Sequence, residues 1–120
     1  MSSTPQPQAD ARHLLLVDDD PDLLRLLAMR LRASRYRVTA VATVEDARTR
    51  LGIERFDLVL SDVRLPDGDG LALFDEIRRQ HATLPVILLT AHGSIPDAVE
   101  ATARGAARYL TKPFDSPVLL

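Results

Sequence analysis

The chain has 120 residues, enough for one globular domain, and its 46% hydrophobic and 27% charged residues exclude a wholly disordered protein. The absence of cysteine excludes disulfide frameworks, thiolate metal sites and cysteine nucleophiles. A net charge of −2 provides no global basic field, so we expect no direct binding of nucleic acid by this segment.

Residues 1–12 are dominated by Ser, Thr, Pro and Gln and predict a flexible tail ahead of one folded domain at 13–120. The tail lacks the apolar stretch of a secretory signal. The longest apolar runs are a handful of residues, far below the ~20 that a membrane-spanning helix needs. We therefore expect a cytoplasmic protein that makes no use of a membrane.

Five short apolar runs predict β-strands along the remainder of the chain. The first is continuous rather than alternating, which is typical of a strand covered on both faces, and the second is the weakest. The loop at 63–70, which contains a Pro-Asp-Gly turn, follows the third run. The five runs lie at 14–17, 36–42, 58–60, 86–89 and 109–111.

Segments with helical periodicity separate these runs. Asp20 is a suitable N-cap for the first helix and Pro21 a suitable first residue. Thr43 and Asp46 have capping-box spacing at the start of the second helix, and Gly105 is placed to end the fourth in a left-handed conformation. The apolar stripes include Leu23, Leu24, Leu27 and Leu31 in the first helix, and Leu71, Phe74 and Ile77 in the third.

Strict alternation of five strands and four helices predicts an α/β fold. Such alternation favours parallel strands joined by right-handed crossovers, with helices on both faces of the sheet in three layers. In an open parallel sheet, ligands bind at the carboxyl ends of the strands, near the point where the strand order reverses. The residues that end the strands are therefore the candidates for function.

Three carboxylates, one hydroxyl and one ammonium group end the predicted strands. Asp18 and Asp19 follow the first, Asp62 ends the third, Thr90 ends the fourth and Lys112 follows the fifth. Clustered carboxylates repel one another, so a site that gathers them usually holds a cation, and all-oxygen ligation suits Mg²⁺. A carboxylate can also attack phosphorus and form an aspartyl phosphate, whose charge a metal ion and a lysine would neutralise.

Other polar residues have simpler interpretations. Asp20 is interpreted as a helix cap, and Asp67 and Asp69 as turn formers, because no glutamate completes a calcium loop after them. We interpret His13 and His81 as solvated surface residues, since no metal-ligand spacing connects the histidines.

Four motifs resemble those of the response-regulator receiver domains of two-component signalling. They occur in the family's order and spacing over about 14–117, and they read LLLVDDDP, LVLSDVRLPDGDG, LLTAHGS and YLTKPF. The resemblance implies a flavodoxin-like (CheY-like) fold with a five-stranded parallel sheet in the order 2-1-3-4-5. The family normally has a fifth helix after the last motif, and we expect it to be largely missing from a chain that stops at residue 120.

The resemblance also implies a role for each residue at the strand ends. Asp62 matches the phosphoacceptor, and Lys112 matches the lysine that contacts the phosphoryl oxygens. Asp18 and Asp19 match the acidic pair that organises Mg²⁺, with Asp19 the more direct ligand. Asp62 and the main-chain carbonyl of Arg64 match the remaining protein ligands, so Mg²⁺ is the expected cofactor.

Further positions match the switch of the family. Thr90 matches the switch hydroxyl, with the small Ala91 beside it, and Tyr109 matches the aromatic residue whose side chain moves inward on activation. The side chains of Arg64 and His92 match positions that flank the path of the water that hydrolyses the phosphoryl group.

Within the family, the stretch from Thr90 to Asp115 is most similar to receivers of NtrC-type activators of sigma-54-dependent transcription, and in particular to the GlrR (QseF) branch. That similarity implies a sensor histidine kinase as phosphodonor and a receiver–receiver homodimer. It also implies AAA+ and helix-turn-helix DNA-binding domains elsewhere in a longer protein.

Three functions remain open from the residues alone. The first is a phosphorylation switch that assists its own phosphorylation and hydrolysis but is not an enzyme on a separate substrate. The second is a Mg²⁺-dependent phosphatase with an Asp nucleophile, although the general acid of haloacid-dehalogenase-type enzymes would fall at Arg64, which cannot serve. The third is a pseudo-receiver that binds partners without being phosphorylated, although every chemical position is filled.

Overall fold

The computed structural model describes residues 12–90 and 95–111. The flexible tail and the incomplete fifth helix predicted from the sequence fall largely on residues 1–11 and 112–120, which lie outside the described residues. No helix in the described ranges is long and apolar enough to cross a membrane.

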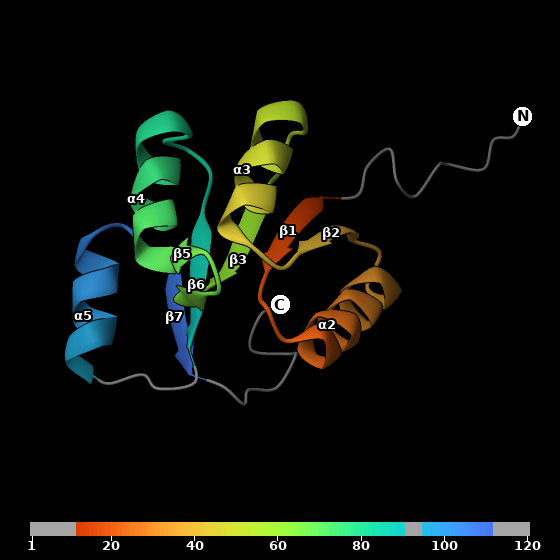
Figure 1. Cartoon of the computed structure of the whole chain (residues 1–120), viewed down its shortest axis with the longest axis horizontal. Helices are drawn as coiled ribbons and strands as arrows, with labels where there is room; N and C mark the ends of the chain where they lie inside the picture. The colour runs from red at the N-terminus through yellow and green to blue at the C-terminus, as the bar shows by residue number, and fades with distance from the viewer. Residues whose placement is uncertain (1–11, 91–94, 112–120) are drawn as a thin grey trace, which may run out of the picture.

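A five-stranded parallel sheet forms the centre of the molecule (Figure 1). Its spatial order is β2-β1-β3-β6-β7, which is the order 2-1-3-4-5 in terms of the five long strands and confirms the prediction. The order reverses between β1 and β3, so the switch point lies where the acidic residues were predicted. The strands are β1 (His13–Val17), β2 (Arg37–Val41), β3 (Leu58–Asp62), β6 (Val86–Thr90) and β7 (Arg108–Thr111).

Helices cover both faces of this sheet, as the alternation predicted (Figure 1). One face packs against α2 (Pro21–Ala33), and the other against α3 (Val44–Ile53), α4 (Gly70–Gln80) and α5 (Ile95–Ala103). Alternate residues of β1 supply both cores, because Leu14 and Leu16 belong to the cluster around α2, and Leu15 and Val17 to the cluster around α3 and α4. All four side chains are at most 3% exposed.

The predicted helix boundaries are confirmed by their caps. Asp20 accepts hydrogen bonds from the backbone N–H groups of Asp22 and Leu23 at the start of α2, where Pro21 is the first helical residue. Thr43 Oγ1 accepts the N–H of Asp46 in the first turn of α3. Gly105 has φ +103°, the left-handed conformation expected of a residue that ends a helix.

A small hairpin occupies the segment that the sequence predicted as a loop. The two-residue strands β4 (Arg64–Leu65) and β5 (Gly68–Asp69) pair in antiparallel fashion. The aspartates of this hairpin are more than turn formers, because each caps a helix. Asp69 Oδ1 accepts the N–H of Leu71 at the start of α4, and Asp67 reaches across to the start of α3.

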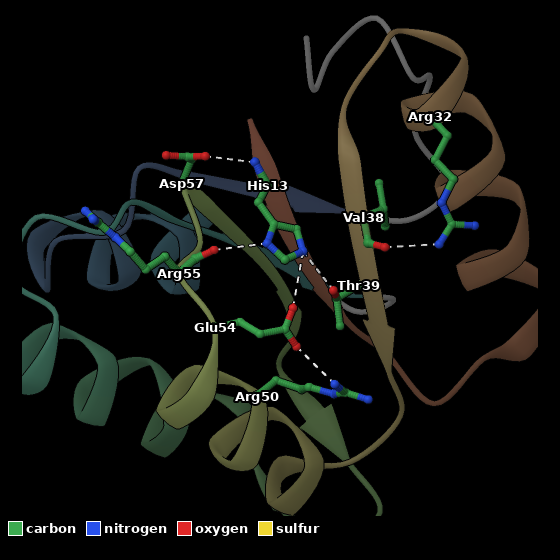
Figure 2. Close-up of polar contacts among 8 residues, drawn as sticks. All are labelled: His13, Arg32, Val38, Thr39, Arg50, Glu54, Arg55 and Asp57. Carbon is green, nitrogen blue, oxygen red and sulfur yellow. Dashed lines mark hydrogen bonds and ion pairs between the residues drawn. The ribbon is translucent and has the colours of Figure 1, made fainter. Parts of the chain in front are cut away.

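His13 is buried, contrary to the prediction that it is a surface residue (Figure 2). Its ring is 4.4 Å from that of Phe56, and its Nδ1 donates a hydrogen bond to the carbonyl of Arg55 at 3.0 Å. Its Nε2 forms a hydrogen bond with the hydroxyl of Thr39 at 2.8 Å and lies 3.7 Å from a carboxylate oxygen of Glu54. The strand begins one residue earlier than predicted, so His13 falls on the same face as Leu15. His81, at the end of α4, is only partly buried.

We expect His13→Ala to lower the free energy of unfolding by about 2–4 kcal/mol, because it removes a buried ring and leaves the Arg55 carbonyl without its donor. His81→Ala is the matched control and should change it by less than about 0.5 kcal/mol. Urea unfolding of the three proteins measures both values, and equal losses would contradict the structural role given to His13.

Candidate functional site

Three carboxylates meet at the carboxyl ends of β1 and β3. One oxygen from each of Asp18, Asp19 and Asp62 lies within 4.8 Å of the others. The strand register explains the meeting, because Val17 pairs with Ser61 and the next residue of each strand is an aspartate. Asp18 and Asp62 are buried, at 1% and 8% exposure, whereas Asp19 is exposed. The cluster therefore combines two buried carboxylates with one that is exposed to solvent.

Asp18 is held by the main chain on two sides. Its N–H donates to the carbonyl of Val41, the last residue of β2, at 3.1 Å. Its Oδ1 accepts the N–H of Asp20 at 2.9 Å, which tightens the turn that leads into α2. Asp18 therefore ties the acidic cluster to the ends of β1 and β2, while Asp19 projects beside it.

Asp62 ends the central strand of the sheet, between β1 and β6. Its Oδ1 accepts the backbone N–H of Arg64 at 3.1 Å, and the neighbouring Ser61 hydroxyl donates to the Asp62 carbonyl at 3.0 Å. These bonds fix the carboxylate at the start of the hairpin. The backbone of Arg64, whose carbonyl is the predicted third metal ligand, is thus directly connected to the Asp62 side chain.

Gly70 packs against the backbone of Asp62, a contact that the sequence analysis missed. A Cβ atom on Gly70 would lie 2.0 Å from the Asp62 carbonyl oxygen, so only glycine fits there. The N–H of Gly70 also donates to the carbonyl of Val63 at 2.7 Å. The last glycine of the PDGDG sequence was the available signal, since a glycine at the start of a helix often marks a close approach of two backbones.

The remaining predicted residues end β6 and β7. Thr90 is buried at 5% exposure at the end of β6, one residue past Leu89, which pairs with Asp62, and it pairs in register with Thr111 of β7. Tyr109 lies in β7 opposite Leu88. Lys112, which directly follows Thr111, lies outside the described part of the chain, as do Ala91 and His92.

The acidic cluster has the chemistry that a divalent cation requires. It offers oxygen ligands only, and two of its three carboxylates are buried, which makes their mutual repulsion costly without a nearby positive charge. Such a ligand set suits a hard cation such as Mg²⁺ better than softer metals such as Zn²⁺ or Cu²⁺, which favour nitrogen or sulfur ligands.

Comparisons with known proteins agree with this arrangement. The family model of the response regulator receiver domain matches residues 14–120. The transcriptional regulatory protein GlrR of Escherichia coli (strain K12) is 50% identical over 89% of this chain and 24% of its own length. The DNA-binding transcriptional regulator NtrC of Proteus hauseri is 41% identical over 83% of this chain and 21% of its own. The chain thus spans about a quarter of the length of these relatives.

A solved structure supports the same conclusion for the fold. The beryllofluoride-activated NtrC4 receiver domain dimer superposes with a TM-score of 0.84 and 32% identity, over 88% of each chain. The resemblance to NtrC-type receivers, and to GlrR among them, is therefore confirmed. The chain belongs to the family of response-regulator receiver domains.

Proposed function

We propose that this chain is a phosphorylation switch in which Asp62 accepts a phosphoryl group from a histidine kinase. The observation that carries the proposal is the position of Asp62, which lies buried at the end of the central strand within 4.8 Å of two further carboxylates. In the transfer, a carboxylate oxygen of Asp62 forms a bond to phosphorus while the bond between phosphorus and the donor imidazole breaks.

The residues around Asp62 would orient this reaction. The Arg64 N–H holds one carboxylate oxygen, which limits rotation of the side chain. Thr90, at the end of the adjacent strand, would donate its hydroxyl proton to a phosphoryl oxygen. Lys112 would balance the negative charge of the phosphoryl group. Tyr109 would change the position of its side chain when Asp62 is phosphorylated.

The carboxylates of Asp19 and Asp62 and the carbonyl of Arg64 would hold Mg²⁺, with Asp18 organising the site. A bound Mg²⁺ would neutralise negative charge that develops on the transferring group. The role of Asp18 follows from its two main-chain bonds and its burial, which fix its carboxylate beside the other two.

The output follows from the kinship with NtrC-type activators. We propose a cytoplasmic regulator in which a sensor histidine kinase sets the phosphorylation of this receiver. The receiver, as a homodimer, would control AAA+ and helix-turn-helix DNA-binding domains and thereby sigma-54-dependent transcription. Receiver domains of transcriptional regulators are generally not enzymes, and we propose that this one turns over no separate substrate, so generic phosphomonoesters should remain intact in its presence.

Replacing Asp62 with Asn should abolish phosphorylation, because the amide keeps the shape of the side chain but lacks the nucleophilic oxygen. Wild type and Asp62→Asn are incubated with acetyl phosphate and Mg²⁺, and intact mass is measured. The wild type should gain one phosphoryl group and the variant none. An adduct in Asp62→Asn at the wild-type level would refute the assignment, and no adduct in the wild type would favour a pseudo-receiver.

Magnesium should raise the melting temperature of the wild type, because binding to the folded state relieves repulsion among the three acids. At a concentration of about ten times Kd, linkage contributes about 1.4 kcal/mol, which corresponds to several degrees for a domain of this size. Asp19→Ala should respond much less to Mg²⁺. Asp22→Ala, an exposed acid of α2 outside the cluster, is the control and should respond like the wild type. Equal responses of Asp19→Ala and wild type would remove Asp19 from the site.

The exposed side chain of Arg64 should shield the phosphorylated Asp62 from water. Arg64→Ala should therefore lose its phosphoryl group several-fold faster than the wild type, as followed by intact mass after removal of the donor. Arg79→Ala, an exposed arginine of α4, should decay at the wild-type rate. Unchanged decay in both Arg64→Ala and His92→Ala would show that neither residue tunes the lifetime.

A further inference from the structure

Asp67, at the tip of the β4–β5 hairpin, caps the start of α3, whose first two residues precede it by more than twenty positions. Its Oδ1 accepts the N–H of Val44 at 2.8 Å, and its Oδ2 accepts the N–H of Glu45 at 3.1 Å. These are the first two residues of α3, and the local cap Thr43 takes only the N–H of Asp46. Both oxygens of one carboxylate therefore join the hairpin to the start of α3.

The base of the same hairpin is attached to the phosphoacceptor. The N–H of Arg64 donates to Asp62 Oδ1 at 3.1 Å, and Arg64 pairs with Asp69 across the hairpin. Gly70, the next residue, lies against the Asp62 carbonyl. A displacement of the hairpin tip would therefore move the Arg64 backbone, which supplies one proposed metal ligand and orients another.

The start of α3 is attached to the other half of the acidic cluster. α3 begins three residues after Val41, whose carbonyl accepts the N–H of Asp18 at 3.1 Å. Hydrogen bonds and short stretches of chain thus connect the two halves of the acidic cluster. The Asp18 N–H is bound to the end of β2, which leads into α3. The start of α3 is bound to Asp67 in the hairpin, and the hairpin is bound to Asp62 through the Arg64 N–H. The side chain of Asp67 makes the connection between α3 and the hairpin.

We infer that Asp67 is a positioning residue for metal binding and phosphoryl transfer, because it ties the hairpin that carries Arg64 to the start of α3 and thereby holds the Arg64 backbone against Asp62. The inference rests on the proposed function, since it assumes that these residues hold Mg²⁺. Asp67 touches neither the metal nor the phosphoryl group. It acts through the Arg64 backbone.

The ionised carboxylate is the form of Asp67 that makes these bonds. The N–H of Val44, more than any other group, lowers the pKa of Asp67 below its ordinary value of 3.8. The bonds to α3 are therefore fully present above that value and are lost only as the pH falls through the lower pKa of the folded state. The hairpin is also anchored by Leu65, which is 9% exposed, so the segment has a second attachment when Asp67 is replaced.

The test compares Asp67→Ala with Thr43→Ala at pH 7. Each variant removes a side-chain cap from the first turn of α3, but only Asp67→Ala cuts the link to the hairpin. Magnesium is titrated while backbone amide resonances are followed by NMR, at a temperature at which all proteins are fully folded. Disruption of residues that support metal ligands typically weakens metal binding by about 10–100-fold, and we expect the lower end of that range for Asp67→Ala. Thr43→Ala should stay within about twofold of the wild type.

A second measurement separates positioning from a general loss of stability. The initial rate of phosphorylation by acetyl phosphate is measured against Mg²⁺ concentration. Asp67→Ala should need about tenfold more Mg²⁺ for half the maximal rate, with a maximal rate close to wild type, and Asp67→Asn, which keeps one acceptor oxygen, should fall between the two. Equal magnesium dependence in Asp67→Ala and Thr43→Ala would overturn the inference. Failure of the wild type itself to bind Mg²⁺ or accept phosphate would instead overturn the proposed function.

Discussion

The repulsion among Asp18, Asp19 and Asp62 is the constraint around which this domain is built. Three negative charges within 4.8 Å oppose folding, and two of them are withdrawn from water. The fold holds them there with backbone N–H groups, which donate to Asp18 and Asp62 from the turns that follow β1 and β3. It also leaves Asp19 exposed, so that a cation can reach the cluster from solvent. The proposed Mg²⁺ would relieve the repulsion within this cluster.

Much of this arrangement could be predicted from the sequence, because parallel strands have a simple rule for where their ends meet. The continuous apolar runs identified the five long strands, and the alternation with helices placed Asp18, Asp19, Asp62 and Thr90 at one edge. Caps such as Asp20 and Gly105 were also predictable, since their partners lie within a few residues in the chain.

The features that the sequence did not predict are either too short to show a periodicity or depend on partners that are distant in sequence. Strands of two residues, such as β4 and β5, carry no periodicity, and the bonds from Val44 and Glu45 to Asp67 span more than twenty residues. The burial of His13 likewise depends on Arg55 and Phe56, which lie more than forty residues further along the chain. A single polar residue at the end of an apolar run gives no indication of such a partner.

His13 begins β1, at the amino end of the sheet, whereas Asp18 follows β1 and Asp62 ends β3, at the carboxyl end. His13 joins β1, β2 and the connection between α3 and β3 through contacts with Thr39, Arg55 and Asp57, none of which belongs to the acidic cluster of Asp18, Asp19 and Asp62. The structural contacts of His13 and the acidic cluster thus lie at opposite ends of the sheet. A change in the exposed side chain of Arg64 would therefore leave the contacts of His13 intact, so the two ends of the sheet can be altered independently by mutation.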